Sequence, residues 1–329
     1  MRNLVSLLIF ITLGISNNYA YAQQNISKNE KNTLSDNYYL NLGILAAENN
    51  KPDSAIHYIS KSIELNKKNP IAYYIRATVF YELKHFDKAL EDLNQSIKIN
   101  PKDQKAIYLR AIVNQNKMDY LKASKDYETL IKMNSTDSNY YFQYAYCLQE
   151  LNENQKSIDA YLNYEKLVKV PAKEFFVNII YNYVQLKKYS EALTYIIKSK
   201  KQGYISHELI QLEIDILSSQ QKCDEALKLF EDNEKSLENK AITLTNLGMC
   251  LLRNKDYTKA NQALLKAYEI DRSLVENLFN IAYVQQQLGN PTNTIVYLEQ
   301  FVDESKNRND LKELRDQAIR LLDSIKKNK

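Results

Sequence analysis

The sequence predicts an all-α fold, an extended array of helix-turn-helix units, and three observations predict it. The 329 residues include only five glycines and five prolines, far fewer than strand-rich or loop-rich folds need for their turns. Small residues recur every 34 residues, with apolar residues around them at helical spacing. With 44% hydrophobic and 26% charged residues, the composition excludes a disordered chain and a multi-spanning membrane protein.

The first 22 residues are typical of a secretory signal peptide. Arg2 precedes an apolar stretch from Leu4 to Ile15, which is shorter than the ~20 residues that cross a bilayer. A small-x-small site ends at Ala22, and no cysteine lies near it to carry a lipid. We expect cleavage near Ala22, export to the periplasm or beyond, and no stable membrane insertion afterwards. An uncleaved amphipathic anchor is the alternative. A polar lead segment, residues 23–35, follows.

Two sets of small residues define eight units. The first set advances in steps of 34, with one step of 35: Ala55, Ala89, Ala123, Ser157, Ala192, Ala226, Ala260 and Thr294. The second set lies twelve residues earlier and is mostly Gly or Ala: Gly43, Ala77, Ala111, Ala145, Ile180, Ile214, Gly248 and Ala282. Where helix axes approach to about 8 Å, only small side chains leave room for the facing helix. Each unit is therefore predicted to be a pair of packed amphipathic helices.

This pattern resembles the tetratricopeptide repeat family, in an exported bacterial type. The seventh unit shows the family motif as Leu244, Leu247, Gly248, Leu251, Tyr257, Ala260, Leu264, Ala267 and Ile270. The resemblance implies a right-handed superhelix of eight repeats, expected at residues 36–69, 70–103, 104–137, 138–172, 173–206, 207–240, 241–274 and 275–308. Residues 309–329 are expected to form a capping helix, whose apolar stripe covers the open face of the last repeat. Ile180, Ile214 and an extra residue near Pro171 depart from the pattern.

The three cysteines, Cys147, Cys223 and Cys250, are widely separated and odd in number. That number excludes a disulfide framework of the kind that small secreted domains use. Export would permit a single bridge, and this stays open. We expect buried free thiols, because a large helical array does not need covalent cross-links.

No catalytic, cofactor or metal motif is found in the sequence. Four glycines remain beyond the leader, too few for a phosphate-binding loop, and His57, His85 and His207 lie far apart. Metal-ligand spacings of His and Cys are absent, as are serine nucleophile motifs. The formal net charge of +4 is too even to indicate nucleic acid as the partner. The sequence thus predicts a protein that is not an enzyme, with no cofactor and no nucleic-acid partner.

The resemblance places the candidate partner-binding site on the concave side of the array. In the family, four places on each first helix line this side, and their ligands usually bind there. By register, the aromatic residues at these places are Tyr74, Tyr81, Tyr108, Phe142, Tyr146, Tyr181, Phe279 and Tyr283. Tyrosines are also common there in repeats of any specificity, so the aromatic lining is a weak signal. The Lys and Asn of the clamp for chaperone C-termini are replaced here, as at Tyr74 and Thr78.

Two functions are predicted. The first is a non-enzymatic exported scaffold that binds a peptide segment or a partner protein in the concave groove, because Tyr and Phe give contact area at low entropic cost and amides pair with backbone groups. The alternative is a glycan-binding module of the bacterial envelope, because stacked tyrosine rings also suit sugars.

Overall fold

The computed structural model describes residues 35–327, and every regular element in that range is a helix. This confirms the predicted all-α fold class. The expected signal peptide, residues 1–22, and all but the last residue of the lead segment lie outside the described residues. None of the helices in residues 35–327 is both long and apolar enough to cross a bilayer.

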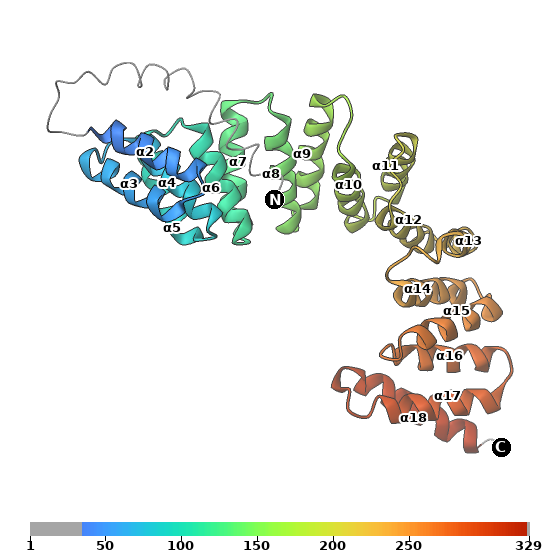
Figure 1. Ribbon diagram of the computed structural model, residues 1–329. Coiled ribbons are helices and arrows are strands. Elements are labelled where there is room, and N and C mark those ends of the chain that lie inside the picture. The colour runs from blue at the N-terminus through green and yellow to red at the C-terminus, as the bar shows by residue number, and fades with distance from the viewer. Residues whose placement is uncertain (1–34, 328–329) are drawn as a thin grey trace. The chain divides into compact units, whose positions relative to one another are not determined.

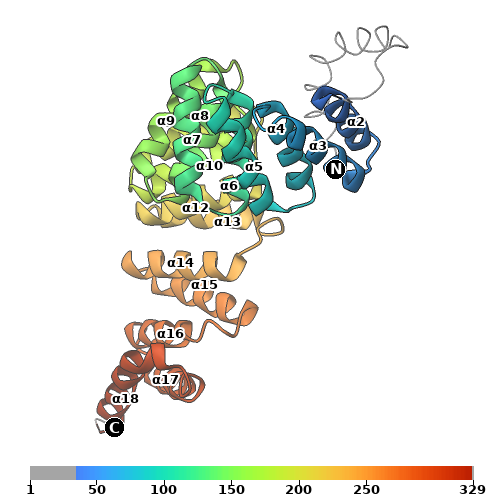
Figure 2. The same ribbon diagram turned by 90° about the vertical axis from the view of Figure 1, so that its left-hand side faces the viewer.

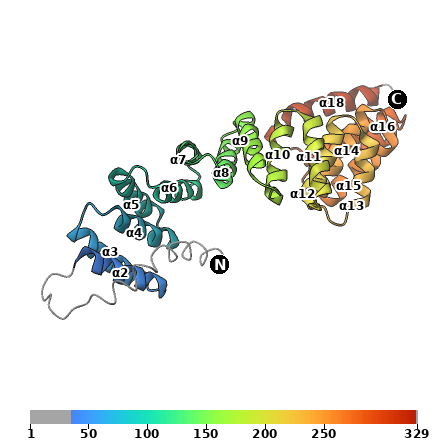
Figure 3. The same cartoon turned by 90° about the horizontal axis from the view of Figure 1, so that it is seen from above.

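The chain divides into two compact units, and the boundary in the sequence lies between Glu153 and Asn154. Unit 1 contains α2–α8, of which α2–α7 run in successive pairs (Figures 1 and 3). Their bounds are Asp36–Glu48, Pro52–Leu65, Pro70–Glu82, Phe86–Ile99, Gln104–Asn116, Tyr120–Met133 and Ser138–Glu150. The boundary falls inside the fourth expected repeat, with α8 in unit 1 and α9 in unit 2.

Unit 2 contains α9–α18, and its last helices follow one another in layers (Figure 2). The bounds of α9–α13 are Asn154–Leu167, Lys173–Gln185, Tyr189–Lys201, His207–Ser219 and Cys223–Asn233. Those of α14–α18 are Lys240–Arg253, Tyr257–Ile270, Glu276–Gln287, Pro291–Glu304 and Lys312–Lys327. The capping segment is not one continuous helix, because a 3-10 turn, Asn309–Leu311, precedes α18. Its apolar stripe, including Ala318 and Leu322, packs with Leu298 and Phe301 of α17.

A left-handed residue ends the first helix of every pair. The turns between paired helices span three residues each, and the middle residue has a positive φ in all eight of them. These residues are Asn50, Lys84, Met118, Asn152, Lys187, Gln221, Lys255 and Gly289. In the second pair, for example, the amides of Lys84 and His85 donate to the carbonyls of Tyr81 and Phe80. This closure satisfies carbonyl groups that the helix end would otherwise leave without partners.

The small residues make the close helix contacts that their spacing predicts. All eight members of the first set are completely buried. A Cβ added to Gly248 would lie 2.6 Å from Cγ of Leu264 on the partner helix α15, and one added to Gly43 would clash with Ile59 on α3. At these two positions glycine is required by packing, since both lie inside helices. Ile180 and Ile214, the two departures, are also fully buried.

Two neighbouring repeats of unit 1 contain the same buried ion pair. Arg76 on α4 donates two hydrogen bonds to Asp92 on α5, at 2.7 and 2.8 Å, and a third to Ser60 Oγ on α3 at 2.9 Å. One period later, Arg110 binds Asp126 through two bonds of 2.7 and 2.9 Å and Asn94 through one of 2.8 Å. Each arginine therefore joins its own pair of helices to the second helix of the preceding repeat.

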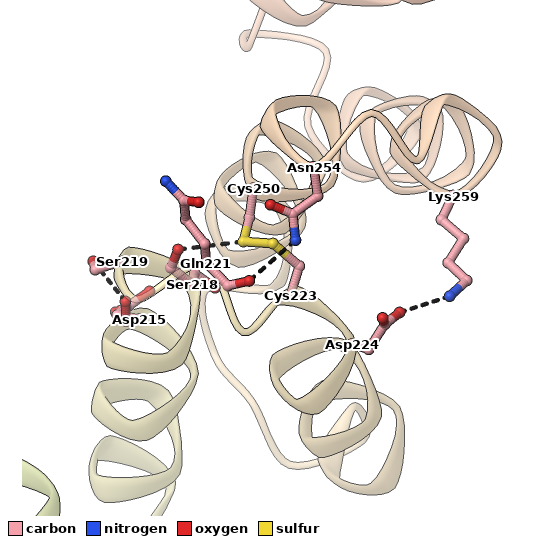
Figure 4. The surroundings of a disulfide bond; sticks show 9 residues. All are labelled: Asp215, Ser218, Ser219, Gln221, Cys223, Asp224, Cys250, Asn254 and Lys259. Carbon is pink, nitrogen blue, oxygen red and sulfur yellow. Dashed lines mark hydrogen bonds and ion pairs between the residues drawn. A yellow bond between two sulfur atoms is a disulfide. The ribbon is translucent and has the colours of Figure 1, made fainter.

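The structure corrects the expectation of free thiols for two of the three cysteines. Cys223, the first residue of α13, forms a disulfide with Cys250 in α14, and their Cα atoms are 5.7 Å apart. Cys147 is a buried free thiol, as expected. The bridge lies where α13 is followed by an irregular six-residue connection, residues 234–239. Asn254 Nδ2 donates to the Gln221 carbonyl at 3.0 Å, and Lys259 Nζ pairs with Asp224 at 2.6 Å, across the same junction (Figure 4).

The left-handed positions predict opposite effects of glycine and alanine. Replacing Gly289 (φ 74°) with alanine should lower the free energy of unfolding by about 1 kcal/mol, because a Cβ is disfavoured at positive φ and nothing lies within 4 Å to compensate. Lys255→Gly, at φ 63°, should instead be neutral or stabilising. Urea denaturation of both variants tests this. Equal destabilisation by the two changes would contradict the account.

Candidate functional site

Five of the eight predicted site residues lie on neighbouring first helices of unit 1. Tyr74 and Tyr81 are on α4, Tyr108 is on α6, and Phe142 and Tyr146 are on α8. All five are half-buried. Their rings are therefore held by packing on one side while part of each ring stays accessible, which is what a preformed contact surface requires. We refer to these five residues as the aromatic face.

Asparagines of the following first helix hold two of the tyrosine hydroxyls. Asn139 Nδ2 on α8 donates to Tyr108 Oη at 2.7 Å, and Asn116 Nδ2 on α6 donates to Tyr81 Oη at 3.5 Å. The first bond is short and the second is at the long limit for a hydrogen bond. Both contacts connect one repeat to the next across the aromatic face. The orientation of these tyrosines is thus set by the stacking of repeats.

A chain of side-chain amides continues behind Tyr108. The fully buried Tyr127 donates its hydroxyl to Gln115 Oε1 at 2.5 Å, and Gln115 Nε2 donates to Gln143 Oε1 at 3.2 Å. Because one oxygen accepts and one nitrogen donates, the Gln115 amide is fixed in a single orientation. This series of hydrogen bonds ends at Gln143, which takes part through its Oε1 and not through its Nε2.

Ring contacts hold the same tyrosines from the sides. The Tyr108 ring lies 6.1 Å from that of Tyr127 and 5.7 Å from that of Tyr140, measured between centroids. Tyr146 meets Tyr120 edge to face at 6.1 Å. These distances and tilts are in the range of favourable aromatic pairs. The tyrosines therefore have little rotational freedom to lose when a ligand binds.

The phenols of the aromatic face are neutral at physiological pH. Burial raises the pKa of Tyr74 and Tyr108 above the usual value of a tyrosine. Burial, reinforced by the charge of Glu150, raises the pKa of Tyr146 to about 12. These groups can donate and accept hydrogen bonds but carry no negative charge. The aromatic face thus offers rings and hydroxyls in place of ion pairs.

The other three predicted residues belong to unit 2. Tyr181 on α10 and Tyr283 on α16 are largely exposed, at 40% and 44% of their surface. Phe279, also on α16, packs against Phe301 of α17 with 5.6 Å between ring centroids, so its ring contributes to the core of the last repeat. Tyr181 lies in the fifth expected repeat, whereas the two residues on α16 lie in the eighth. We therefore base the candidate site on unit 1.

Sequence register did not identify Asn116 or Gln143 as members of the site. Neither lies at one of the four family places on its helix, although Asn139 and Gln115 do. The signal that would have found them is their separation along the sequence from a partner on the preceding first helix. Asn116 follows Tyr81 by 35 residues, and Gln143 follows Gln115 by 28.

The described residues contain no group of three or more His, Cys, Asp or Glu side chains that could hold a metal ion. The polar groups of the aromatic face are phenols, and those of the asparagines and glutamines that contact it are amides; neither group titrates near neutral pH. This arrangement suits recognition by contact and hydrogen bonding.

Family profiles match three parts of the chain. Tetratricopeptide repeat profiles match residues 36–69 and residues 70–103, which are the first two expected repeats. A profile of the coatomer epsilon subunit matches residues 180–321 of unit 2. No curated protein matches the sequence significantly.

Solved structures of MamA share a similar arrangement over about half of this chain. The structure titled "Crystal structure of MamA protein" is 17% identical, with a TM-score of 0.48, over 52% of this chain and 94% of that one. MamA from Desulfovibrio magneticus RS-1 is 16% identical, with a TM-score of 0.47, over 50% and 93%. The MamA D159K mutant is 18% identical, with a TM-score of 0.48, over 54% and 97%.

The profile matches and the repeated geometry agree. Residues 36–69 and 70–103 each match a tetratricopeptide repeat, and each forms a helix pair closed by a left-handed turn. The same 34-residue spacing of left-handed residues continues to Gly289 with a single 35-residue step. The chain therefore contains tetratricopeptide repeats, a repeat type that forms protein-interaction scaffolds, and the helix pairs that follow them keep the same period.

Proposed function

We propose that this protein is a non-enzymatic scaffold that binds an extended peptide segment of a partner protein on the aromatic face of unit 1. One observation carries the proposal. Asn139, from the next repeat, donates a hydrogen bond of 2.7 Å to the Tyr108 hydroxyl, while the Tyr108 ring stays partly accessible. Because such a surface is already ordered before binding, a ligand loses little affinity to the ordering of side chains.

The chemistry of the face favours a peptide of mixed polar and apolar character. Half-buried rings offer contact area to apolar side chains, and the Gln143 amide offers hydrogen bonds to an extended backbone. The places that hold Lys and Asn in the chaperone-tail clamp are occupied by Tyr108 and Ile112 in the third repeat. A terminal carboxylate is therefore not the group that this face would recognise.

We further propose that the protein acts outside the cytoplasm, exported by its N-terminal leader and cleaved near Ala22. The apolar stretch from Leu4 to Ile15 supports this assignment. The Cys223–Cys250 disulfide supports it independently, since disulfides persist mainly in oxidising compartments. The partner would then be a periplasmic, envelope or secreted protein.

Peptide display with the purified chain, residues 23–329, tests the proposed binding. Peptides that bind are then measured by fluorescence anisotropy against the triple variant Tyr81→Ala, Tyr108→Ala and Phe142→Ala. We expect affinity to fall at least about tenfold, because truncating even one central aromatic residue in an interface typically costs 1 kcal/mol or more. Tyr283→Ala, an exposed tyrosine of unit 2, is the matched control and should bind normally.

Two outcomes would overturn the proposal. Peptides that bind the triple variant as well as the parent chain would remove the aromatic face from the interaction. A glycan array hit that the same triple variant abolishes, together with no peptide binding, would identify the protein as the glycan-binding module. Circular dichroism of each variant establishes that the helices are intact before binding is compared.

A further inference from the structure

A polar pocket lies between two first helices of unit 2, and none of its lining residues belongs to the proposed peptide site. Its lining comes from α12 and α14: Asp215, Ser218, Ser219, Asn246, Met249 and Arg253. Asp215 and Ser218 occupy the register that faces the concave side in the family. The pocket therefore opens on a surface that the repeat architecture leaves available to ligands.

Asp215 is a half-buried carboxylate with amide donors but no cation beside it. Gln211 Nε2 donates to its Oδ1 at 3.4 Å, and the Asn246 side chain donates as well. No Lys, Arg or His among the described residues lies within ion-pairing distance of it. Burial raises the pKa of Asp215, with the two amides acting in the opposite direction. The carboxylate is thus positioned by neutral donors and left without a counter-ion.

Arg253 provides a cation at another part of the same lining. It is the last residue of α14 and is exposed, and no carboxylate of the described residues lies within ion-pairing distance of it. A basic residue in the last turn of a helix stabilises the helix dipole. That role leaves the five guanidinium N–H donors available to a ligand carboxylate.

Ser218 gives a second, independent indication of a ligand. Only 6% of the Ser218 surface is exposed. Its hydroxyl oxygen has less than 1 Å² of accessible surface and makes no hydrogen bond within the described part of the chain. Buried hydroxyl groups in folded proteins almost always have a partner, so one without a partner in a pocket wall is unusual. A rotation of the Ser218 side chain that turns the hydroxyl into the pocket would let a ligand supply the missing bond.

The disulfide holds this pocket together. The Cys250 sulfur lies 3.2 Å from the carbonyl oxygen of Ser218, one residue after the pocket residue Met249 (Figure 4). The bridge ties α14 to the start of α13, which follows α12 after a turn of three residues. The spacing between Asp215 on α12 and Arg253 on α14 is therefore covalently restrained.

We propose that this pocket binds a small zwitterion that carries both an ammonium and a carboxylate group, as amino acids and short peptides do. The ammonium group pairs with Asp215 and the carboxylate pairs with Arg253. Ser219 Oγ, which donates to the Asp215 carbonyl at 2.8 Å, is left as an acceptor for the ligand. A simple anion would be repelled by Asp215 and a simple cation by Arg253. Only a ligand with both charges satisfies both groups.

Isothermal titration of the chain, residues 23–329, with the twenty amino acids, dialanine and trialanine tests the proposal. We expect saturable binding by members of this panel and at least a tenfold loss of affinity on N-acetylation or on C-amidation. The comparison of amino acids with the two peptides identifies the source of the zwitterion. Absence of binding by every panel member at about 10 mM would overturn the proposal, as would equal binding of the blocked forms.

Variants distinguish a role of the two charged residues in ligand binding from a purely structural role. Asp215→Asn keeps the shape and should lose binding about tenfold or more, and Arg253→Gln should do the same. Lys228→Gln, an exposed cation on α13, is the matched control and should bind normally.

Without ligand, the effects of Asp215→Asn and Arg253→Gln on the urea midpoint should be additive. Strong coupling between them would show that they pair with each other and would overturn the assignment.

Reduction adds a further readout. Because the bridge restrains the two walls, dithiothreitol should weaken zwitterion binding while leaving peptide binding on unit 1 unchanged. Affinity for the zwitterion that does not change on reduction would overturn the claim that the disulfide organises the pocket. Since the two sites lie in different units, failure of one proposal is distinguishable from failure of the other.

Discussion

Replacing Arg76 with methionine should lower the free energy of unfolding by about 3 kcal/mol or more at pH 7, because the change leaves a buried carboxylate without its partner. The Asp92 side chain is only 4% exposed and receives two hydrogen bonds from Arg76. Methionine keeps most of the side-chain volume, so the effect reports the lost charge and bonds. Urea denaturation followed by circular dichroism measures it.

The pH dependence of this effect has a definite sign. Burial raises the pKa of Asp92, and the hydrogen bond and charge of Arg76 lower it. Without Arg76, burial and the charge of Glu91 both raise the pKa of Asp92, so the folded chain holds the Asp92 proton more tightly than the unfolded chain. The destabilisation should therefore be small below the unfolded pKa of about 4, grow as the pH rises from there to the folded pKa, and level off above it.

A double variant provides the control. Arg76→Met with Asp92→Leu removes both charges and should recover most of the stability that Arg76→Met loses, because a buried ion pair is often worth little relative to an apolar pair. Lys98→Met, at an exposed position of α5, should change stability by no more than about 0.5 kcal/mol. If the double variant is as unstable as the single one, an unpaired carboxylate is not the cause.

Loss of the Cys223–Cys250 bridge should cost about 3.5 kcal/mol, the chain-entropy value for a closed loop of 27 residues. The loop contains α13, the irregular connection 234–239 and most of α14. The double variant Cys223→Ser and Cys250→Ser tests this in urea denaturation, with and without dithiothreitol. Reductant should destabilise the parent chain and leave the double variant unchanged.

Thiol counting provides the control for the bridge. The unfolded, unreduced chain should react with one equivalent of thiol reagent, from Cys147, and the reduced chain with three. The single variant Cys147→Ala should leave the response to reductant intact. Three reactive thiols in the unreduced chain would contradict the disulfide and restore the expectation of free thiols.

The helices and their pairing were predictable because their determinants are local and periodic. Ala89 and Gly248 recur in a register that only close helix packing explains, and the structure places both in buried contacts. Pro52 and Pro291 begin second helices, as a residue without an amide hydrogen can. The capping segment was less predictable, since the turn at Asn309–Leu311 depends on contacts with the preceding repeat.

The candidate site was predictable only in part. Register alone placed Tyr81 and Tyr108 on first helices, because one period carries each residue to the same helical face. It did not indicate that Asn116 and Asn139 hold their hydroxyls, or that Phe279 packs on Phe301. These contacts join successive helices, so they depend on how far each helix is rotated about its axis.

The sequence by itself determined the all-α class, the 34-residue repeat and the positions where small residues allow two helices to pack closely. It could do so because secondary structure and packing within a repeat follow from spacing along the chain. Only the tertiary structure decided that Cys223 meets Cys250, that Arg76 meets Asp92 and Ser60, and that Asp215 and Arg253 share a pocket. Each of these contacts depends on the stacking angle between helices, which the spacing of residues in one sequence does not specify.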